Sequence, residues 1–534
     1  MGSSASAPPV TAWAPLRHPL FRWLWIASLV SQVGSFMSDV AQGWLITSLS
    51  ASPLTISLLT TAASLPVFLL GLPAGALADV VDRRRLLIAT QCALVLVTGL
   101  LAAVTFGGSV TPGLLIALAF AMGIATSLNG PAWFSIPSEI LPPEDLAGGV
   151  ALNGVAFNVA RVLGPALGGA IVVAAGPAFA FTVDALSTFG VIVVLFRWRR
   201  ETPVTVLPAE RMVGAMKAGL RFARHSQPLR CVLLRAAAFI SCACVVLALL
   251  PVVARETQGG PLAYGLLLGS LGLGAVLGAL VLPRVRRQLS PDAIVTGGSG
   301  LFAVACAGIG FIRVLPLLCP IFLVGGLAWM AVLSTLNVGA QIVSPPWVRS
   351  RALAVYLLVF QGGIAAGAAL WGSVANAVGT STAFASAAAG LAIGALGLSH
   401  LRLPGREPPD LAPTRHWPAP AVAARPDPEA GPVIVQLEYR IDPAREAEFL
   451  RATRALESIR RRDGAFEWWL LRDSSDPALY VEIFAVESWA EHLRQHERGS
   501  AADREVEERV LAFHTGARPV ARHLVAGSTA GPPR

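Results

Sequence analysis

Twelve apolar stretches of membrane-spanning length constrain this chain more than any other feature. A transmembrane helix needs about 20 predominantly apolar residues, and most of these stretches reach that length. They cover residues 21–48, 54–78, 86–106, 112–136, 148–174, 178–197, 230–254, 262–284, 293–314, 316–343, 350–378 and 381–403. Only 14% of the residues are charged, against roughly 25% in an ordinary soluble protein. The sequence therefore predicts an all-α polytopic membrane protein with twelve transmembrane helices in a lipid bilayer.

Arginine is unevenly distributed between the two ends of the predicted spans. Basic residues follow spans two, six and eight and precede span eleven, whereas the opposite side holds only Arg255 and Arg313. The positive-inside rule then places the basic loops and both chain termini in the cytoplasm of a bacterium, with the protein in its inner membrane. The net charge of +9 follows from this topology, so we expect no nucleic-acid partner.

The chain divides into two predicted halves of six helices. The first half covers residues 21–197, after a cytoplasmic N-terminus at 1–20, and the second half covers 230–403. Segment 198–229 connects the halves in the cytoplasm. Its apolar residues have helical spacing, so we expect an amphipathic helix on the inner membrane surface.

A charged loop marks the same place in each half. Gly75 is expected to allow close helix packing and a tight exit from span two, Asp79 lies at the cytoplasmic end of that span, and Arg83 and Arg84 stand opposite it. The pattern recurs in the second half as Gly278, Leu280, Arg286 and Arg287, without an acidic residue. Such repetition is typical of two-halved secondary transporters. The alternative is a basic loop that only sets topology.

Three ionisable residues fall inside predicted spans: Asp39, Arg161 and Asp184. A charge at membrane depth is costly and needs a partner or a water-filled cavity. At about 1.5 Å per residue, Asp39 and Arg161 lie near 14 and 16 Å from the outer ends of their helices, and Asp184 near 9 Å. We therefore pair Asp39 with Arg161 and hypothesise that Asp39 gains and loses a coupling proton. A static structural ion pair is the alternative.

Span five contains a group of small residues with one proline. They are Gly154, Gly164, Pro165, Gly168 and Gly169. Gly-Pro bends a helix, and glycines admit a close neighbour. Arg161 shares the helix face of Gly154 and Gly168, seven residues away on each side. Generic small-residue packing is the alternative.

A soluble domain follows the last span. Residues 404–432 are Pro-rich and predict an extended, poorly ordered linker. Residues 433–526 predict a small α+β domain of ferredoxin-like order, and 527–534 a disordered tail. The expected elements are strands at 433–440, 465–472, 478–486 and 519–525 and helices at 443–462 and 488–514, with Ser488 as N-cap. Of the adjacent Trp468 and Trp469, one should face the helices and the other solvent or a partner.

No catalytic or metal site emerges from the sequence. His492 and His496 are four apart on one helix face, but no third ligand has a suitable spacing, so we predict no metal. The six cysteines lie in apolar stretches. We predict no cofactor and no enzymatic activity, and favour a regulatory or oligomerising C-terminal domain. An active oxygenase or ligand-sensing domain is the alternative.

The whole chain resembles one branch of the major facilitator superfamily, the transmembrane secretion effector group that includes enterobactin-exporter-like proteins. The resemblance is carried by the segments Ser31–Trp44, Gly75–Leu87, Asn158–Pro165, Glu210–Arg221, Tyr439–Pro443 and Ser488–Arg498. It implies export of a small molecule such as a drug, siderophore or other secondary metabolite by alternating access. Import is the alternative direction.

The resemblance also assigns roles to the two motifs. It implies that Asp79 and the Arg83–Arg84 cluster form a charge network that holds one conformation and breaks during transport. It associates the glycine-proline motif of span five with exporters that run as proton antiporters. The C-terminal domain is similar to small antibiotic-biosynthesis-monooxygenase domains, which implies dimerisation through their sheets.

Overall fold

The computed structural model describes residues 13–198, 212–405, 410–412, 414, 416–418, 420, 422 and 426–526, without the side chains of residues 76, 79, 80, 212, 213 and 215. The chain forms two compact units. The first comprises residues 1–208, 234–336 and 357–401 and holds the long apolar helices. The second comprises residues 209–233, 337–356 and 402–534 and holds the C-terminal sheet.

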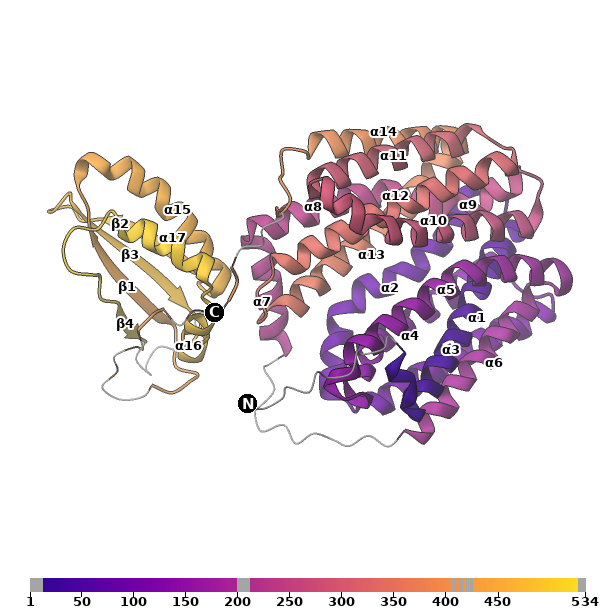
Figure 1. Cartoon of the computed structure of the whole chain (residues 1–534), viewed down its shortest axis with the longest axis horizontal. Coiled ribbons are helices and arrows are strands. Elements are labelled where there is room, and N and C mark those ends of the chain that lie inside the picture. Colours follow the sequence, from indigo (N-terminus) through magenta and orange to yellow (C-terminus); the bar gives the residue numbers. More distant parts are fainter. Residues whose placement is uncertain are drawn as a thin grey trace, which may run out of the picture. The chain divides into compact units, whose positions relative to one another are not determined.

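Long helices make up the first half of the predicted membrane region (Figure 1). They are α1 (Pro19–Leu49), α2 (Pro53–Val80), α3 (Arg83–Phe106), α4 (Pro112–Ile140), α5 (Pro143–Ala175) and α6 (Pro177–Arg197). Several begin at an N-cap with proline just inside, as at Ser52 and Thr111, whose side chains accept the amide protons of Thr55 and Leu114. Residues 137–147, which lay outside any predicted span, are mostly helical.

The helices of the second half follow the predicted order with one difference. They are α8 (Gln227–Ala243), α9 (Val245–Glu256), α10 (Gly260–Gln288), α11 (Pro291–Phe311), α12 (Leu315–Ile342), α13 (Arg349–Val378) and α14 (Thr380–Gly397). The predicted span 230–254 is interrupted at Cys244, where α8 gives way to α9. The other predicted boundaries agree to within a few residues.

Eleven helices of the described chain are long and apolar enough to cross a membrane, counting α8 and α9 as one. Helix α1 is not in that set. It carries the polar residues Ser31, Gln32, Ser35, Ser38 and Asp39 along its middle. It packs against α5 and α6 of the same bundle. The chain is therefore a multi-span membrane protein.

Buried side chains tie the first-half helices together at the end where α2 meets α3. Leu24, Ala78, Leu87, Ala132 and Leu195 come from five different helices and form one apolar cluster. By contrast, large apolar side chains elsewhere on these helices point outward. Leu96, Phe106, Phe134, Leu186 and Ile393 are each more than half exposed, as expected of surfaces that face lipid.

The C-terminal domain is a four-stranded antiparallel sheet with order β2-β3-β1-β4. Its elements are β1 (Val433–Arg440), α15 (Glu446–Asp463), β2 (Glu467–Arg472), β3 (Leu479–Val486), α16 (Trp489–Arg498), α17 (Ala501–Leu511) and β4 (Arg522–Val525). Trp468 packs into the core with Phe484, whereas Trp469 is 43% exposed, as predicted for adjacent strand residues.

The single helix predicted at 488–514 is wrong. The chain leaves the helix at Gly499, and Ser500 starts a new one by forming a capping box with Asp503. Ser488 does cap the first of these helices, because its hydroxyl accepts the amide proton of Glu491.

Helix α7 (Met212–His225) replaces the amphipathic helix expected on the membrane surface. The rest of that prediction, residues 199–211, lies outside the described residues. The apolar face of α7 is covered by protein: Phe222 is 1% exposed and meets the Trp347 ring edge-to-face at 6.0 Å. Arg221 forms a 2.7 Å ion pair with Glu491 of α16. The helix therefore belongs to the unit that contains the C-terminal domain.

Candidate functional site

A cavity of about 290 Å³ lies among six helices of the membrane unit. Helices α1, α2, α4 and α5 of the first half and α9 and α10 of the second half line it. Most of the lining is apolar, and its polar members are Asp39, Gln42, Thr60, Ser64, Arg161 and Tyr264. An apolar cavity with few polar groups, where two repeats meet, is the usual form of a small-molecule site in a two-halved transporter.

The structure brings Asp39 and Arg161 to the same cavity. Asp39 on α1 is exposed to its open space, and Arg161 on α5 is half-buried. Within the described chain no ion pair of 4 Å or less joins the two side chains. The carboxylate and the guanidinium therefore stand on one wall surface as separate charges, available to a ligand or to water.

Asp184 has a different environment. It is 3% exposed on α6 and accepts a hydrogen bond from the Ser35 hydroxyl of α1 at 3.0 Å. A second hydroxyl pair, Ser31 and Thr188, links the same helices at 3.1 Å. Asp184 is outside the described lining of the cavity, so its contacts fasten α6 to α1.

Tyr264 of α10 was not singled out from the sequence. It approaches α1 so closely that a Cβ on Gly43 would lie 2.4 Å from the Tyr264 hydroxyl oxygen. The one signal in the sequence was a lone tyrosine in an otherwise apolar span. Its position makes it the second half's polar contribution to the cavity wall.

The small residues of α5 form two tight interfaces. A Cβ on Gly164 would lie 2.4 Å from the Cβ of Phe36 on α1, and one on Gly168 would lie 2.9 Å from the Cα of Met37. On another side of α5, a Cβ on Gly169 would lie 2.8 Å from the Pro261 carbonyl oxygen of α10. Glycine is required at these positions because any side chain would push the helices apart.

Two further members of the motif behave differently from one another. Pro165 lies within the continuous helix α5, and its carbonyl oxygen would be 2.4 Å from a Cβ on Gly265 of α10. Gly154 has no neighbour within 4 Å of a built Cβ, so the expectation of close packing is wrong there. The packing part of the motif is therefore its second half, from Gly164 onward.

The charged loop after α2 has partners other than those expected. Arg83 pairs with Glu139 at the end of α4 at 3.0 Å, and Arg84 donates to the carbonyl oxygens of Leu195 and Phe196 at the end of α6 at 3.0 and 2.9 Å. These bonds satisfy free carbonyls and place cations at a helix C-terminus. The loop therefore ties three helix ends together.

Two expectations about this loop need separate statements. The side chain of Asp79 lies outside the described residues. Gly75 has no atom within 4 Å of a built Cβ, so its expected role in close helix packing is wrong. Asp82 supplies the turn instead, because its carboxylate caps α3 by accepting the Arg85 amide proton at 2.9 Å.

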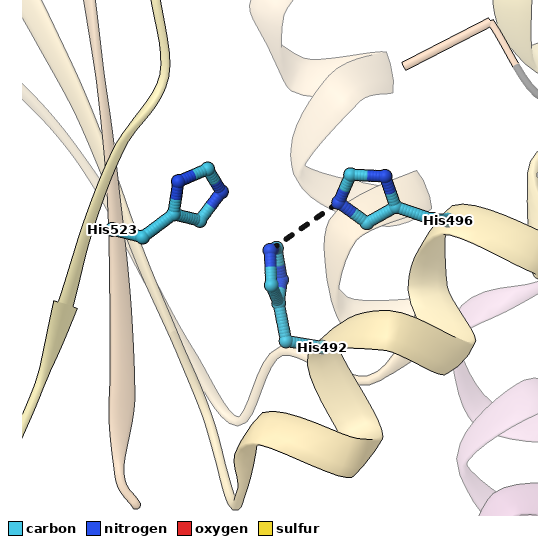
Figure 2. Close-up of side chains that lie close together, drawn as sticks. All are labelled: His492, His496 and His523. Carbon is cyan, nitrogen blue, oxygen red and sulfur yellow. Dashed lines mark hydrogen bonds between the residues drawn. The ribbon is translucent and has the colours of Figure 1, made fainter. Parts of the chain in front are cut away.

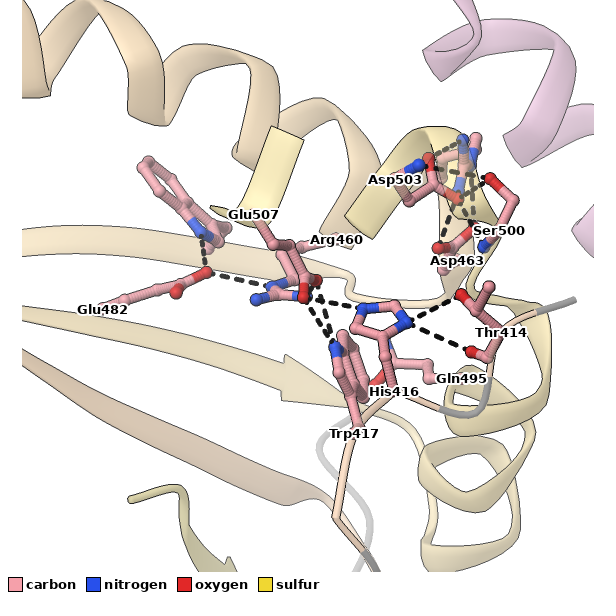
Figure 3. A network of polar contacts seen from close by, with 12 residues as sticks. Thr414, His416, Trp417, Arg460, Asp463, Glu482, Gln495, Ser500, Asp503 and Glu507 are labelled. Atoms are coloured by element: carbon pink, nitrogen blue, oxygen red, sulfur yellow. Dashed lines mark hydrogen bonds and ion pairs between the residues drawn. The ribbon is translucent and has the colours of Figure 1, made fainter. Parts of the chain in front are cut away.

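A second cavity, of about 530 Å³, lies in the C-terminal domain beside a buried Arg460. This α15 side chain is 4% exposed and donates to Glu482 at 3.1 Å and to Glu507 at 2.6 Å (Figure 3). Its guanidinium also faces the rings of Trp417 and Phe484 at 4.6 and 5.2 Å. Burial opposes the charge, but the two carboxylates outweigh it and hold the pKa of Arg460 above its ordinary value.

Glu507 also binds the chain that precedes the domain. Its carboxylate accepts from His416 Nε2 and Trp417 Nε1, both at 2.8 Å. Burial raises the pKa of Glu507, but Arg460 and His416 outweigh it and lower the pKa to about 2. The hydrogen bond to Glu507 in turn raises the pKa of His416. This part of the predicted linker is thus fastened to α17, contrary to the expectation of poor order.

Three histidines meet at the wall of the same cavity (Figure 2). The Nε2 atoms of His492 and His496 lie 3.3 Å apart, and one nitrogen of each of these rings and of His523 lies within 4.8 Å of the others. Burial, and then the neighbouring imidazoles, lower the pKa of His492 to about 3 and that of His496 to about 4. The expectation that no third ligand joins the pair is therefore wrong.

Comparison with known proteins settles which family carries this architecture. The family model described as "Transmembrane secretion effector" matches residues 10–530. The chain belongs to this family. It is accordingly a transporter of the major facilitator superfamily and not an enzyme.

Curated relatives of this transmembrane secretion effector are exporters or transporters of small molecules. The multidrug efflux pump Tap of Mycobacterium tuberculosis is 27% identical over 418 residues, which are 74% of this chain and 96% of Tap. The staphyloferrin A transporter of Staphylococcus aureus is 23% identical over 308 residues, 57% of this chain and 77% of the relative. The enterobactin exporter EntS of Salmonella typhi is 26% identical over 298 residues, 54% of this chain and 70% of EntS.

Solved structures show the fold that the transmembrane secretion effector shares with other transporters. The nucleoside transporter NupG superposes with a TM-score of 0.61 at 9–12% identity and, in its better match, covers 72% of this chain and 99% of its own. A human organic anion transporter superposes with a TM-score of 0.51 at 18% identity, covering 73% of this chain and all of its own. At these identities the likeness concerns the fold alone.

Proposed function

We propose that this transmembrane secretion effector is a secondary active exporter that carries a small molecule across the bacterial inner membrane by alternating access. The carrying observation is the cavity of about 290 Å³ between the two halves, which presents one carboxylate and one guanidinium in an apolar wall. The export functions named for Tap and EntS support the direction. A drug, siderophore or other secondary metabolite is the proposed class of substrate.

Proton antiport is the proposed driving reaction, with Asp39 as the residue that binds and releases the proton. Its carboxylate faces the cavity and has no ion-pair partner within 4 Å among the described residues. A carboxylate in a mostly apolar cavity can be neutral when protonated and can bind a cation or Arg161 when ionised. Asp184 is the second candidate, although its bond to Ser35 favours a structural role.

We place α1 as a twelfth span and both termini in the cytoplasm. Helix α1 packs beside α5 and α6 within the bundle, which supports a crossing despite its polar residues. With this orientation, the ends of α5 and α10 near Gly169 and Gly265 lie toward the outside. Their close approach supports a state closed on the outer side and accessible from the cytoplasm.

The C-terminal domain is proposed to be ferredoxin-like and to lie in the cytoplasm. The strand order β2-β3-β1-β4 with three helices supports this fold. Its outer sheet face carries exposed Trp469 and Leu471, which supports dimerisation with a second copy of the domain.

The decisive experiment is transport into inside-out membrane vesicles with a panel of fluorescent drugs and metal-free siderophores. We expect uptake of at least one substrate that stops when the proton gradient is collapsed, and loss of this proton dependence in Asp39→Asn. The matched control is Asp145→Asn, because Asp145 is an acid outside the cavity that pairs with His18 at 2.8 Å.

Three outcomes would contradict the proposal. Uptake only into right-side-out vesicles would make the protein an importer. Asp39→Asn vesicles with unaltered proton-driven uptake would remove Asp39 from the coupling step. Turnover of a substrate by the purified full-length protein without membranes would make the C-terminal domain an oxygenase or another enzyme.

A further inference from the structure

The three histidines of the C-terminal domain come from two elements that face each other across the cavity wall (Figure 2). His492 and His496 are one turn apart on α16, and His523 is on β4. His492 is 1% exposed, and the other two are half-buried. Transport by the membrane helices gives these residues no part, so the question of their function is separate from the proposed function above.

The fold, and not chance proximity, orients the third imidazole. In the sheet register His523 is opposite Val435, and Val435 is opposite Phe484, both of which are buried under the helices. Directly opposed strand residues point to the same face, so His523 also points toward α16. Its ring centroid lies 4.8 Å from that of His492.

The spacing of the nitrogens suits a small metal ion. Ligand nitrogens at about 2.0–2.1 Å from Zn²⁺ in tetrahedral geometry lie roughly 3.3 Å from one another. The Nε2 atoms of His492 and His496 are 3.3 Å apart in the structure. The full set of three lies within 4.8 Å, so a modest rotation of the His523 ring completes the site.

A neighbouring side chain supports the same reading. Gln495, which is 1% exposed, has its Oε1 atom 3.3 Å from Nδ1 of His492. When Nδ1 carries the proton and donates it to this oxygen, the lone pair of Nε2 points to the other imidazoles. Metal-binding histidines commonly have such a second partner, which fixes the tautomer and the ring orientation.

We propose that His492, His496 and His523 bind one divalent transition-metal ion of the zinc class, with a fourth coordination position open to the cavity. Imidazole is a preferred ligand for Zn²⁺, Co²⁺, Ni²⁺ and Cu²⁺. Three neutral ligands leave the ion its full double charge. The open position therefore favours water or an anionic oxygen, and the adjoining cavity of about 530 Å³ has room for a small ligand that carries one.

A hydrogen bond between imidazoles is the competing explanation of the cluster. It accounts for the contact of His492 with His496, and aromatic packing against Trp417 and Trp489 accounts for part of the burial. It gives no reason for a third imidazole nitrogen at the same point. The experiment must therefore separate metal binding from packing.

The test uses the full-length protein, purified without a histidine tag, stripped with a chelator and titrated with Co²⁺. We expect one tightly bound ion per chain and the intense visible absorption of four-coordinate Co²⁺, which Zn²⁺ then displaces. Each of His492→Ala, His496→Ala and His523→Ala should weaken binding by at least 100-fold, because loss of even an outer-shell partner costs on the order of 10–100-fold. His400→Gln is the control, since His400 is exposed and outside the cluster.

His523→Cys keeps the proposal falsifiable if an alanine variant fails to fold. A thiolate is also a good ligand, so this variant should bind Co²⁺ and add a sulfur-to-metal charge-transfer band in the near ultraviolet. The proposal is overturned if the stripped wild type takes up no ion, or if the alanine variants bind Co²⁺ as the wild type does. Neither result would affect vesicle transport as the test of export.

Discussion

The guanidinium of Arg255 lies 3.2 Å from the carbonyl oxygen of Ser50, so a cation of the second half caps the end of α1 in the first half. The same side chain reaches the carbonyl oxygens of Thr47 and Ala51, each at 3.3 Å. Positive charge at a helix C-terminus is stabilising, and the bonds satisfy otherwise free carbonyls. Arg255 therefore holds the two halves together at this end of the bundle.

Replacing Arg255 should shift the transporter toward the state that is open at this end. A single charged hydrogen bond contributes about 1.5–3 kcal/mol. Because 1.4 kcal/mol is tenfold in an equilibrium constant, Arg255→Gln should raise the open population by about tenfold or more. Distances between spin labels on α1 and α10, measured in nanodiscs, report this population directly.

Arg313→Gln is the matched control for that experiment. Arg313 lies at the same end of the bundle but pairs with Glu256 at 2.6 Å and with carbonyls of its own helix, all within the second half. Its loss should leave the spin-label distances unchanged. Equal shifts in both variants would mean that the effect comes from lost positive charge and not from the contact between the halves.

The glycines of α5 should differ in their tolerance of alanine. Gly164→Ala would place a Cβ 2.4 Å from the Cβ of Phe36 and should destabilise the protein by about 1–3 kcal/mol, the usual cost of overpacking. Gly154→Ala meets open space and should be neutral or slightly stabilising, because alanine favours a helix over glycine by about 1 kcal/mol. Thermal unfolding in detergent distinguishes them, and similar losses in both would contradict the packing argument.

The ends of most helices were predictable because apolar length decides where a chain can cross a membrane. Depth along the helices also placed Asp39 and Arg161 together, and both line one cavity. Depth carries no information about rotation around a helix axis, so it could not show that the two charges do not pair. The break between α8 and α9 at Cys244 lies in a uniformly apolar run without glycine or proline and left no local signal.

Other parts of the site depended on long-range contacts. Glu139, the partner of Arg83, lay outside the predicted spans because α4 was expected to end at 136. His523 joins His492 only through the register of β4 on β1, which spacing along the chain does not reveal. By contrast, the break between α16 and α17 was readable, since Ser500 and Asp503 have the spacing of a capping box directly after a glycine.

Charge reversal should test whether the Arg83–Glu139 pair controls conformation. Both side chains are partly exposed, so the pair should contribute little to overall stability. We expect Arg83→Glu and Glu139→Arg each to reduce vesicle transport, and the double reversal to restore part of it. Arg85→Glu is the control, because Arg85 is exposed and its side chain makes the same change of charge at the next turn. Lack of any recovery in the double variant would argue against pairing.

The attachment of His416 to Glu507 should weaken as the pH rises. Glu507 raises the pKa of His416 above its ordinary value of 6.5, so the stabilisation is complete below pH 6.5 and is lost as the pH rises through the folded-state pKa. Hydrogen exchange of the segment 410–418 in the full-length protein, corrected for intrinsic rates, should therefore accelerate above neutral pH. His416→Gln should exchange quickly at every pH, whereas His400→Gln should follow the wild type. A pH profile that survives in His416→Gln would assign the titration to another group.

Trp469 should be the centre of self-association if the C-terminal domains form a dimer. It is 43% exposed on β2, and Leu471, two residues along the same face, is 50% exposed. Directly opposite Trp469 in the register, Ile483 extends this apolar face onto β3. An aromatic residue at the centre of an interface commonly contributes about 2 kcal/mol or more, so Trp469→Asp should weaken the dimer roughly 30-fold. Leu493→Asp is the control, because Leu493 is also 43% exposed but lies on helix α16, away from the sheet face. Mass photometry of the full-length protein in nanodiscs and detergent measures the dimer fraction. A wild type that stays monomeric across the concentration range would contradict the dimer, and an equal loss in Leu493→Asp would move the interface to the helices.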